Sequence, residues 1–208
     1  EGQGPEHSSA RMERFLTLCG NDNMRIVYPT TPAQMFHLLR KQAKNPIHKP
    51  LVVFTPKGLL RLPECVSKLE DLTDGNFVEI YADPTPPANP KRLAFCTGRF
   101  YYDLNAERIK RKTDDLLIVR IEQLYPFPEE CLKKILEPYK HVKNFVWCQE
   151  EPKNQGAWFS LQHDLLECLE TPQTLNYAGR NAAASPAVGY LSVHLKQEEA
   201  LVNQALTG

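Results

Sequence analysis

The sequence lacks the usual marks of a metal site, a disulfide scaffold and a membrane span. Its 6 cysteines form no CxxC pair, and its 6 histidines form neither an HxxxH pair nor a cluster with cysteine. Such spacings are what identify zinc sites and disulfide frameworks, so we expect no metal ligands. We expect reduced cysteines, which are typical of a cytoplasmic protein. No apolar run approaches the roughly 20 residues of a membrane-spanning helix, and we expect no such span.

An excess of positive charge is also missing. Lys plus Arg and Asp plus Glu number 25 each, which gives a formal net charge of +0. Domains that bind nucleic acid usually carry a basic excess, so this balance argues against a nucleic-acid partner. Hydrophobic residues make up 42% of the chain, which is ordinary for a globular protein with a proper core.

Residues 1–62 have the pattern of the last elements of an incomplete α/β domain. Predicted strands at Arg25–Tyr28 and Leu51–Phe54 flank a helix that begins at Thr31 and Pro32, since proline suits the first turn of a helix. The second strand is a continuous apolar run, typical of parallel sheets that are covered on both faces. So few elements leave a sheet unfinished. We therefore interpret this region as the end of a larger domain.

The rest of the chain divides into a connector and a second domain. Residues 63–90 contain closely spaced prolines, which predict a stiff, extended linker. From residue 91 to 208, predicted strands and helices alternate, a pattern that indicates a mostly parallel sheet flanked by helices. The predicted strands are 92–96, 115–124, 144–150 and 174–179, and the predicted helices are 101–112, 128–136, 158–169 and 193–206.

The chain opens with a motif that suits a ligand site. Glycine and proline in EGQGPEHSSAR predict an irregular turn, which leads into a helix that Ser8 or Ser9 caps. Unpaired backbone N–H groups at a helix start favour an anionic ligand. An ordinary capped helix beside a satisfied core histidine is the alternative, and spacing alone favours it. The apolar stripe of the predicted helix consists of Met12, Phe15, Leu16 and Cys19.

This motif resembles a stretch near the C-terminus of the thiamine-diphosphate-dependent E1 components of 2-oxoglutarate dehydrogenase complexes. Enzymes of this family are several times longer, so the chain resembles only their last part. The resemblance implies the end of a pyrimidine-binding domain followed by a transketolase C-terminal-like domain. Further similar strings follow in order: YPTTPAQMFHLLRKQ, KPLVVFTPKGLLR, FCTGRFYYDL, IVRIEQLYPFP, VWCQEEPKNQGAW and YAGRNAAASPAVG.

The resemblance implies a catalytic role for His7. A histidine of this motif lines the substrate pocket in the family, where imidazole can bind or polarise a 2-oxo acid and assist proton transfer. Thiamine diphosphate and Mg²⁺ are the implied cofactors, but the resemblance places the metal motif and the carboxylate that activates the cofactor upstream of residue 1. We therefore expect this chain alone to be inactive.

For the full-length protein, the resemblance implies a cytoplasmic bacterial enzyme of the tricarboxylic acid cycle. It would oxidatively decarboxylate 2-oxoglutarate and transfer the succinyl group to the lipoyl group of E2, the dihydrolipoyl succinyltransferase. The family also implies a homodimer. Two other interpretations stay open: an E1 enzyme for 2-oxoadipate or a related dicarboxylic 2-oxo acid, and a non-catalytic effector-binding or assembly module.

A second candidate site follows the predicted strand 92–96. Gly98 precedes a helix there, at the carboxyl edge of the predicted parallel sheet, where open α/β folds bind ligands. Some family members bind AMP or acetyl-CoA as effectors near this domain. Glu79 and Glu130 would repel a phosphate, so solvated surface charge is the alternative interpretation. The candidate effector-binding residues are Arg25, Lys41, Arg99 and Gln123.

A polar cluster follows the predicted strand 144–150. Glu150 and Glu151 are consecutive, so in a continuing strand their side chains point in opposite directions and form no acid/base pair. Gln149, Glu150, Asn154 and Gln155 are instead expected to hold the turn that leads to the next helix and to form a subunit contact.

Overall fold

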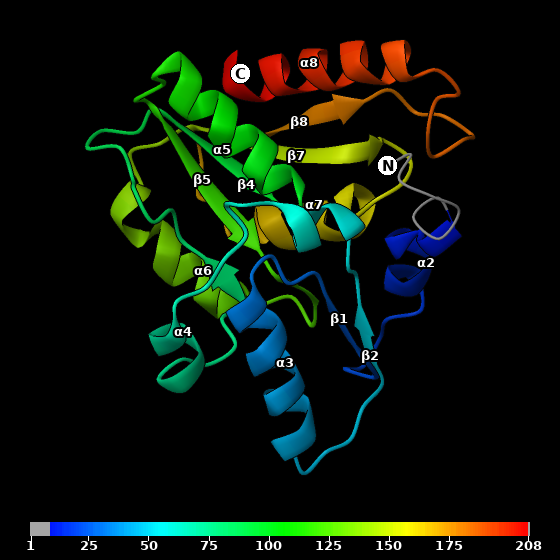
Figure 1. The fold of residues 1–208 in the computed structure, drawn as a ribbon. Coiled ribbons are helices and arrows are strands. Elements are labelled where there is room, and N and C mark those ends of the chain that lie inside the picture. The colour runs from blue at the N-terminus through cyan, green and yellow to red at the C-terminus, as the bar shows by residue number, and fades with distance from the viewer. Residues whose placement is uncertain (1–8, 208) are drawn as a thin grey trace.

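The computed structural model describes residues 9–207 and contains two β-sheets with helices packed around them (Figure 1). The larger sheet has the strand order β3-β5-β4-β7-β8, and the smaller sheet has the order β2-β1-β6. This is the predicted α/β class. The strands are β1 (Arg25–Val27), β2 (Leu51–Val53), β3 (Ile80–Tyr81), β4 (Arg92–Cys96), β5 (Leu116–Ile121), β6 (Gln123–Tyr125), β7 (Asn144–Pro152) and β8 (Thr174–Arg180).

The helices connect and cover these strands. Among the described residues, no helix combines the length and the apolar character needed to cross a bilayer. The helices are α2 (Met12–Thr17), α3 (Pro32–Lys44), α4 (Leu69–Thr73), α5 (Phe100–Arg111), α6 (Glu129–Leu136), α7 (Trp158–Glu167) and α8 (Leu191–Thr207), with 3₁₀ turns η1 (Lys57–Arg61) and η2 (Glu137–Tyr139).

The larger sheet is buried on both faces. Strand β4 pairs in parallel with β5 and β7, β7 pairs in parallel with β8, and only β3 is antiparallel. Successive side chains of a strand point to opposite faces. Leu93 and Phe95 therefore face the core under α6 and α7, whereas Ala94 and Cys96 face the core under α5 and α8. Figure 1 shows α5 and α8 together on one side of the sheet. Burial on both faces explains why β4 is a continuous apolar run.

The smaller sheet is built from two distant parts of the chain. Strand β1 pairs in parallel with β2 and antiparallel with β6, which follows β5 directly. The sequence predicts one strand over residues 115–124, and this is wrong, because the chain leaves the larger sheet at Glu122. The N–H of Glu122 donates to the carbonyl of Glu79, and its carbonyl accepts from the N–H of Tyr28. These bonds carry the chain from one sheet into the other.

The carboxylate of Glu122 fastens this crossing point. It is fully buried and accepts hydrogen bonds from the N–H of Thr30 at 2.8 Å and from Gln34 Nε2 at 3.3 Å. The Thr30 hydroxyl also bonds to it, and Arg120 Nη1 donates to that hydroxyl at 2.8 Å. Burial raises the pKa of Glu122, while the nearby charge of Arg120 and the bonds from Thr30 lower it. We call this group the Glu122 clamp.

The segment 63–90 is more than the extended linker that its prolines predict. It contains α4 and β3, and β3 forms the antiparallel edge of the larger sheet. Asp83 then anchors the following turn. Its carboxylate is buried, pairs with Arg108 of α5 and accepts from the N–H of Ile118 at 3.0 Å. These polar contacts hold the proline-rich segment against the sheet.

The six cysteines are free thiols. Cys96 and Cys148 are fully buried, and burial raises the pKa of Cys96 to about 12. Such buried thiols behave as small hydrophobic residues.

Candidate functional site

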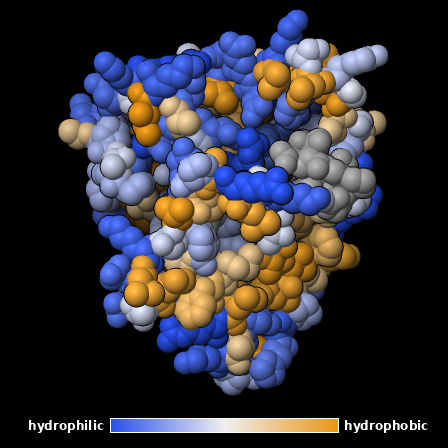
Figure 2. Space-filling view, in the orientation of Figure 1, coloured by the Kyte–Doolittle hydropathy of each residue, from blue (hydrophilic) through white to orange (hydrophobic). Residues whose placement is uncertain are grey.

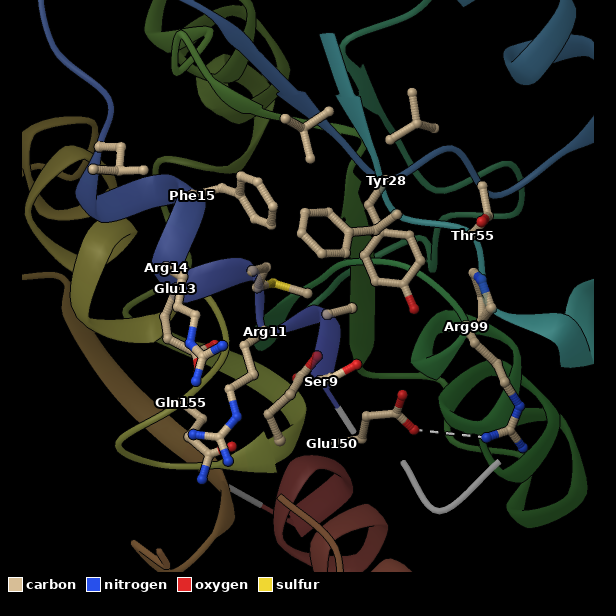
Figure 3. A pocket seen from close by; sticks show the side chains of 18 residues that line it. Ser9, Arg11, Glu13, Arg14, Phe15, Tyr28, Thr55, Arg99, Glu150 and Gln155 are labelled. Carbon is tan, nitrogen blue, oxygen red and sulfur yellow. Dashed lines mark ion pairs between the residues drawn. The ribbon is translucent and has the colours of Figure 1, made fainter. Parts of the chain in front are cut away.

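A cavity of 530 Å³ lies where α2 and β2 meet the end of β7 (Figure 3). One wall is apolar. It includes Phe15 of α2, Val52 and Val53 of β2, and Phe54, which follows β2. Figure 2 shows hydrophobic side chains gathered over β2 on this face of the molecule. The opposite wall is charged. Its charged residues are Arg11, Glu13, Arg14, Arg99, Glu150 and Glu151.

The helix α2 begins differently from the sequence prediction. Its N-cap is Arg11, which has a left-handed φ of 38° and makes no side-chain capping bond. The predicted serine cap is therefore wrong for α2, because the backbone turns at Arg11 after the helical residues Ser9 and Ala10. The predicted apolar stripe is confirmed, since Met12 and Leu16 are buried.

The predicted histidine His7 lies outside the described residues, and its catalytic role stays a prediction. Ser9, Ala10 and Arg11, the first described residues after it, line the cavity.

The end of β7 and the turn that joins it to α7 contribute Glu150, Glu151 and Gln155 to the cavity. Gln149 holds this turn as predicted: its Oε1 accepts from the indole of Trp147 at 2.9 Å and from the N–H of Trp158 at 3.1 Å. Gly156 has a φ of +72° and lies so close that a Cβ would stand 2.8 Å from Gln149 Nε2. The N–H of Gly156 donates to Glu13 Oε2 at 3.0 Å, which fixes α2 on the turn.

Tyr28 stands between the two walls. It follows β1, and its ring packs on Gly98, where a Cβ would lie 2.1 Å from the ring carbon Cζ. Only glycine fits this close approach, and the φ of +63° at Gly98 also favours it. Burial raises the pKa of Tyr28, and the carboxylates of Glu150 and Glu151 raise it further. The phenol is therefore a neutral hydrogen-bonding group near pH 7.

Both Glu150 and Glu151 line the cavity, although the sequence predicts opposite directions for their side chains. Strand β7 does run through them to Pro152, but its register with β8 shifts between Cys148 and Pro152. This irregularity breaks the strict alternation of side chains on which the prediction depends.

Arg99 joins the charged wall from the start of α5. Its Nη1 lies 3.6 Å from Glu150 Oε2, the pair drawn with a dashed line in Figure 3, and its Nη2 lies 3.1 Å from Asp103 Oδ1. The predicted position of Gly98 and Arg99 at the carboxyl edge of the parallel sheet is confirmed, since β4 ends at Cys96 and α5 begins at Phe100.

The other three candidate effector residues lie apart from Arg99. Lys41 Nζ pairs with Glu79 Oε1 at 2.8 Å, and the N–H of Gln123 donates to the carbonyl of Glu79 at 3.0 Å. Arg25 Nη1 donates to Gln42 Oε1 at 2.9 Å, one residue further along α3. The structure thus brings Lys41 and Gln123 together around Glu79, whereas only Arg99 lines the cavity. Effector binding stays a prediction.

Family comparisons identify both regions of the chain. The family model described as "2-oxoglutarate dehydrogenase C-terminal" matches residues 66–206, and the one described as "Transketolase, pyrimidine binding domain" matches residues 1–63. The chain belongs to the 2-oxoglutarate dehydrogenase C-terminal family. The transketolase-like fold that the resemblance implies is consistent with both matches and with the two sheets.

Curated relatives agree with the family over the whole chain. The chain is 51% identical over 209 residues to the 2-oxoglutarate dehydrogenase E1 component of Haemophilus influenzae and 52% identical over 210 residues to that of Coxiella burnetii. It is 50% identical over 212 residues to that of Azotobacter vinelandii. These alignments cover 100%, 99% and 100% of this chain, but each covers only 22% of the relative.

The sequence predicts neither the partner of Arg99 in the cavity wall nor the Glu122 clamp at the crossing between the sheets. Asp103, which pairs with Arg99, carries a signal in the sequence, because charged residues four positions apart meet on a helix. The Glu122 clamp carries none, since Glu122 and Thr30 are far apart in the chain and only the fold joins them.

Proposed function

We propose that this chain is the C-terminal part of the E1 component of a 2-oxoglutarate dehydrogenase. The full-length enzyme decarboxylates 2-oxoglutarate oxidatively and transfers the succinyl group to the lipoyl group of the E2 dihydrolipoyl succinyltransferase. The observation that carries the proposal is the identity of 51% to an E1 component along 100% of this chain. The cavity supports it, because its two walls suit a ligand with a short aliphatic chain and anionic ends.

The charged wall is suited to a dicarboxylate. Arg11, Arg14 and Arg99 bring three guanidinium groups to the cavity, and arginine binds carboxylates with two parallel hydrogen bonds. Glu13, Glu150 and Glu151 balance this charge. The arginines therefore attract an anion while the carboxylates limit how tightly it is held.

The cofactor is only partly accounted for by this chain. The match to a pyrimidine-binding domain and the names of the relatives support thiamine diphosphate as the cofactor that supplies carbanion stabilisation. Among residues 9–207 no group of three or more His, Cys, Asp or Glu side chains can hold a metal ion. The described residues thus do not fit Mg²⁺, and we assign them no step on the cofactor.

His7 is the proposed catalytic residue, and its substitution tests the function. In the full-length enzyme with thiamine diphosphate and Mg²⁺, H7A lowers kcat with 2-oxoglutarate by about 10²–10⁴-fold, the usual contribution of a general acid or base. A dye-reduction assay measures it. The matched control H48A, on the exposed loop after α3, keeps the wild-type kcat. Wild-type turnover in H7A, or turnover by this chain alone, would contradict the proposal.

The same assay separates the alternatives. Initial rates are compared with 2-oxoglutarate and with 2-oxoadipate, which has a longer carbon chain. We expect the higher kcat/KM with 2-oxoglutarate. A full-length protein without turnover on either acid is a non-catalytic module. The proposal for the whole enzyme also includes a homodimer, a cytoplasmic location and an AMP or acetyl-CoA effector at Arg25, Lys41, Arg99 and Gln123.

A further inference from the structure

One guanidinium on the cavity wall is shared by two carboxylates. Arg99 lies 3.1 Å from Asp103 and 3.6 Å from Glu150, and the side chains of Arg99, Asp103 and Glu150 are 25%, 24% and 16% exposed. Arg99 and Glu150 line the cavity, whereas Asp103 supports Arg99 from one turn further along α5. With both carboxylates ionised the group carries a net negative charge. With a proton on Asp103 it is neutral.

The surroundings of Asp103 favour that proton. Its Oδ2 is buried and has no hydrogen-bond partner. Burial is the main cause that raises the pKa of Asp103 to about 6, Glu198 of α8 and Glu150 of β7 raise it further, and Arg99 opposes them. The carboxylate therefore titrates just below neutral pH.

Among residues 9–207, two more titratable or charged groups lie near Glu198. His194 of α8 lies 3.5 Å from Glu198 and 3.1 Å from Arg180 Nη2 at the end of β8. Burial and Arg180 lower the pKa of His194, so both oppose a positive charge on the ring. Arg180 is 8% exposed, and its guanidinium contacts the ring of His194.

We propose that Asp103 sets the affinity of this cavity for a dianionic ligand by controlling how much of the charge of Arg99 is neutralised. The inference rests on the proposed function, since the ligand class is the dicarboxylate of the same cavity. Asp103 touches Arg99 and lines no part of the cavity, so it is a tuning and positioning residue rather than a catalytic one.

Elementary electrostatics gives the direction and size of the effect. Ionised Asp103 gives the group of Arg99, Asp103 and Glu150 a net negative charge that repels an anion, and protonation of Asp103 removes this repulsion. A unit charge one residue away from the ligand, in a partly solvated site, is expected to change the Kd of the ligand by about five- to tenfold. Affinity for the dianion therefore rises as the pH falls through the pKa of Asp103.

Glutarate, a dicarboxylate without the reactive 2-oxo group, is the probe. Calorimetry measures its Kd for the full-length enzyme at about pH 7.5 and about pH 5, on either side of the transition. At the higher pH, D103N binds glutarate about five- to tenfold more tightly than the wild type. At the lower pH the two bind equally, because the wild type is already neutral at this position.

Two further variants control the test. E107Q removes a carboxylate of the same helix that pairs with Lys110 and Arg111. Its Kd for glutarate equals that of the wild type at both pH values. E198Q removes a charge that raises the pKa of Asp103. The pH at which the glutarate affinity changes is therefore lower in E198Q than in the wild type. If D103N does not fold, the absence of that shift in E198Q contradicts the inference.

The results separate this inference from the proposed function. Equal Kd values for D103N and the wild type at the higher pH, a difference that persists at the lower pH, or no glutarate binding by any variant would overturn the inference. Turnover of 2-oxoglutarate is measured on the same preparations. The expected glutarate pattern without turnover contradicts the proposed function and leaves the inference standing.

Discussion

The two sheets differ in how completely the described chain covers them. The larger sheet has helices on both faces, and strands β4, β5 and β7 are almost wholly buried. The smaller sheet has three short strands, and all three residues of its edge strand β2 are only half-buried. The cavity opens beside this less covered strand. The larger sheet thus provides stability, and the smaller sheet provides ligand-facing surface.

A matched pair of leucine substitutions tests this comparison with the largest expected effect. Leu117 of β5 is 1% exposed and packs in the main core, so L117A lowers the free energy of unfolding by about 2–5 kcal/mol. Leu51 of β2 is half-buried, so L51A costs about 1 kcal/mol because less apolar area is lost. Urea unfolding followed by circular dichroism measures both. Equal costs would show that the two sheets are equally well packed.

A glycine pair tests the contact between the sheets and comes next in size. G98A places a methyl group against the ring of Tyr28 at a φ of +63°, and we expect it to cost about 1–3 kcal/mol and to displace Tyr28 in the cavity. The control G20A changes stability by less than about 0.5 kcal/mol, since no atom lies within 4 Å of its Cβ. Thermal unfolding compares the two. Wild-type stability in G98A would contradict the close packing of Tyr28.

The Glu122 clamp gives the smallest and most local effect. E122Q keeps the shape and leaves one oxygen for the N–H of Thr30, but it replaces the acceptor of the Thr30 hydroxyl with an NH2 group, at a cost of about 1–2 kcal/mol. Hydrogen exchange should become faster in the β1–β6 pairing and stay unchanged in β4–β7. The half-buried pair Lys41–Glu79 offers the control E79Q, which changes stability by less than about 1 kcal/mol. If E122Q changed the rate of hydrogen exchange by the same factor in both sheets, the proposed role of the Glu122 clamp would be contradicted.

The elements that the sequence predicts well are those with local causes. The prediction of a strand over residues 92–96 is confirmed to the residue by β4, because an apolar run ends at Gly98 and a helical pattern follows. The start of α3 is also confirmed, since Thr31 caps it and Pro32 occupies its first turn. Each signal lies within a few residues of the element that it defines.

Distant partners decide the features that sequence reasoning misses. The run from Asp115 to Leu124 contains no glycine or proline, yet it divides between two sheets because Glu122 finds partners near Thr30 and Glu79. The cavity depends on distance in the same way. Residues 9–15, 18, 28, 52–56, 99, 150, 151 and 155 meet there, and no local pattern connects them.

The cavity between α2 and β2 is the proposed ligand site of the whole enzyme. The most direct measurement is a structure of the full-length enzyme with bound glutarate. The predicted result is a ligand between α2 and β2, with one carboxylate in contact with an arginine of the charged wall and Arg99 still paired with Glu150. A ligand bound without contact to any residue that lines the cavity would contradict the account.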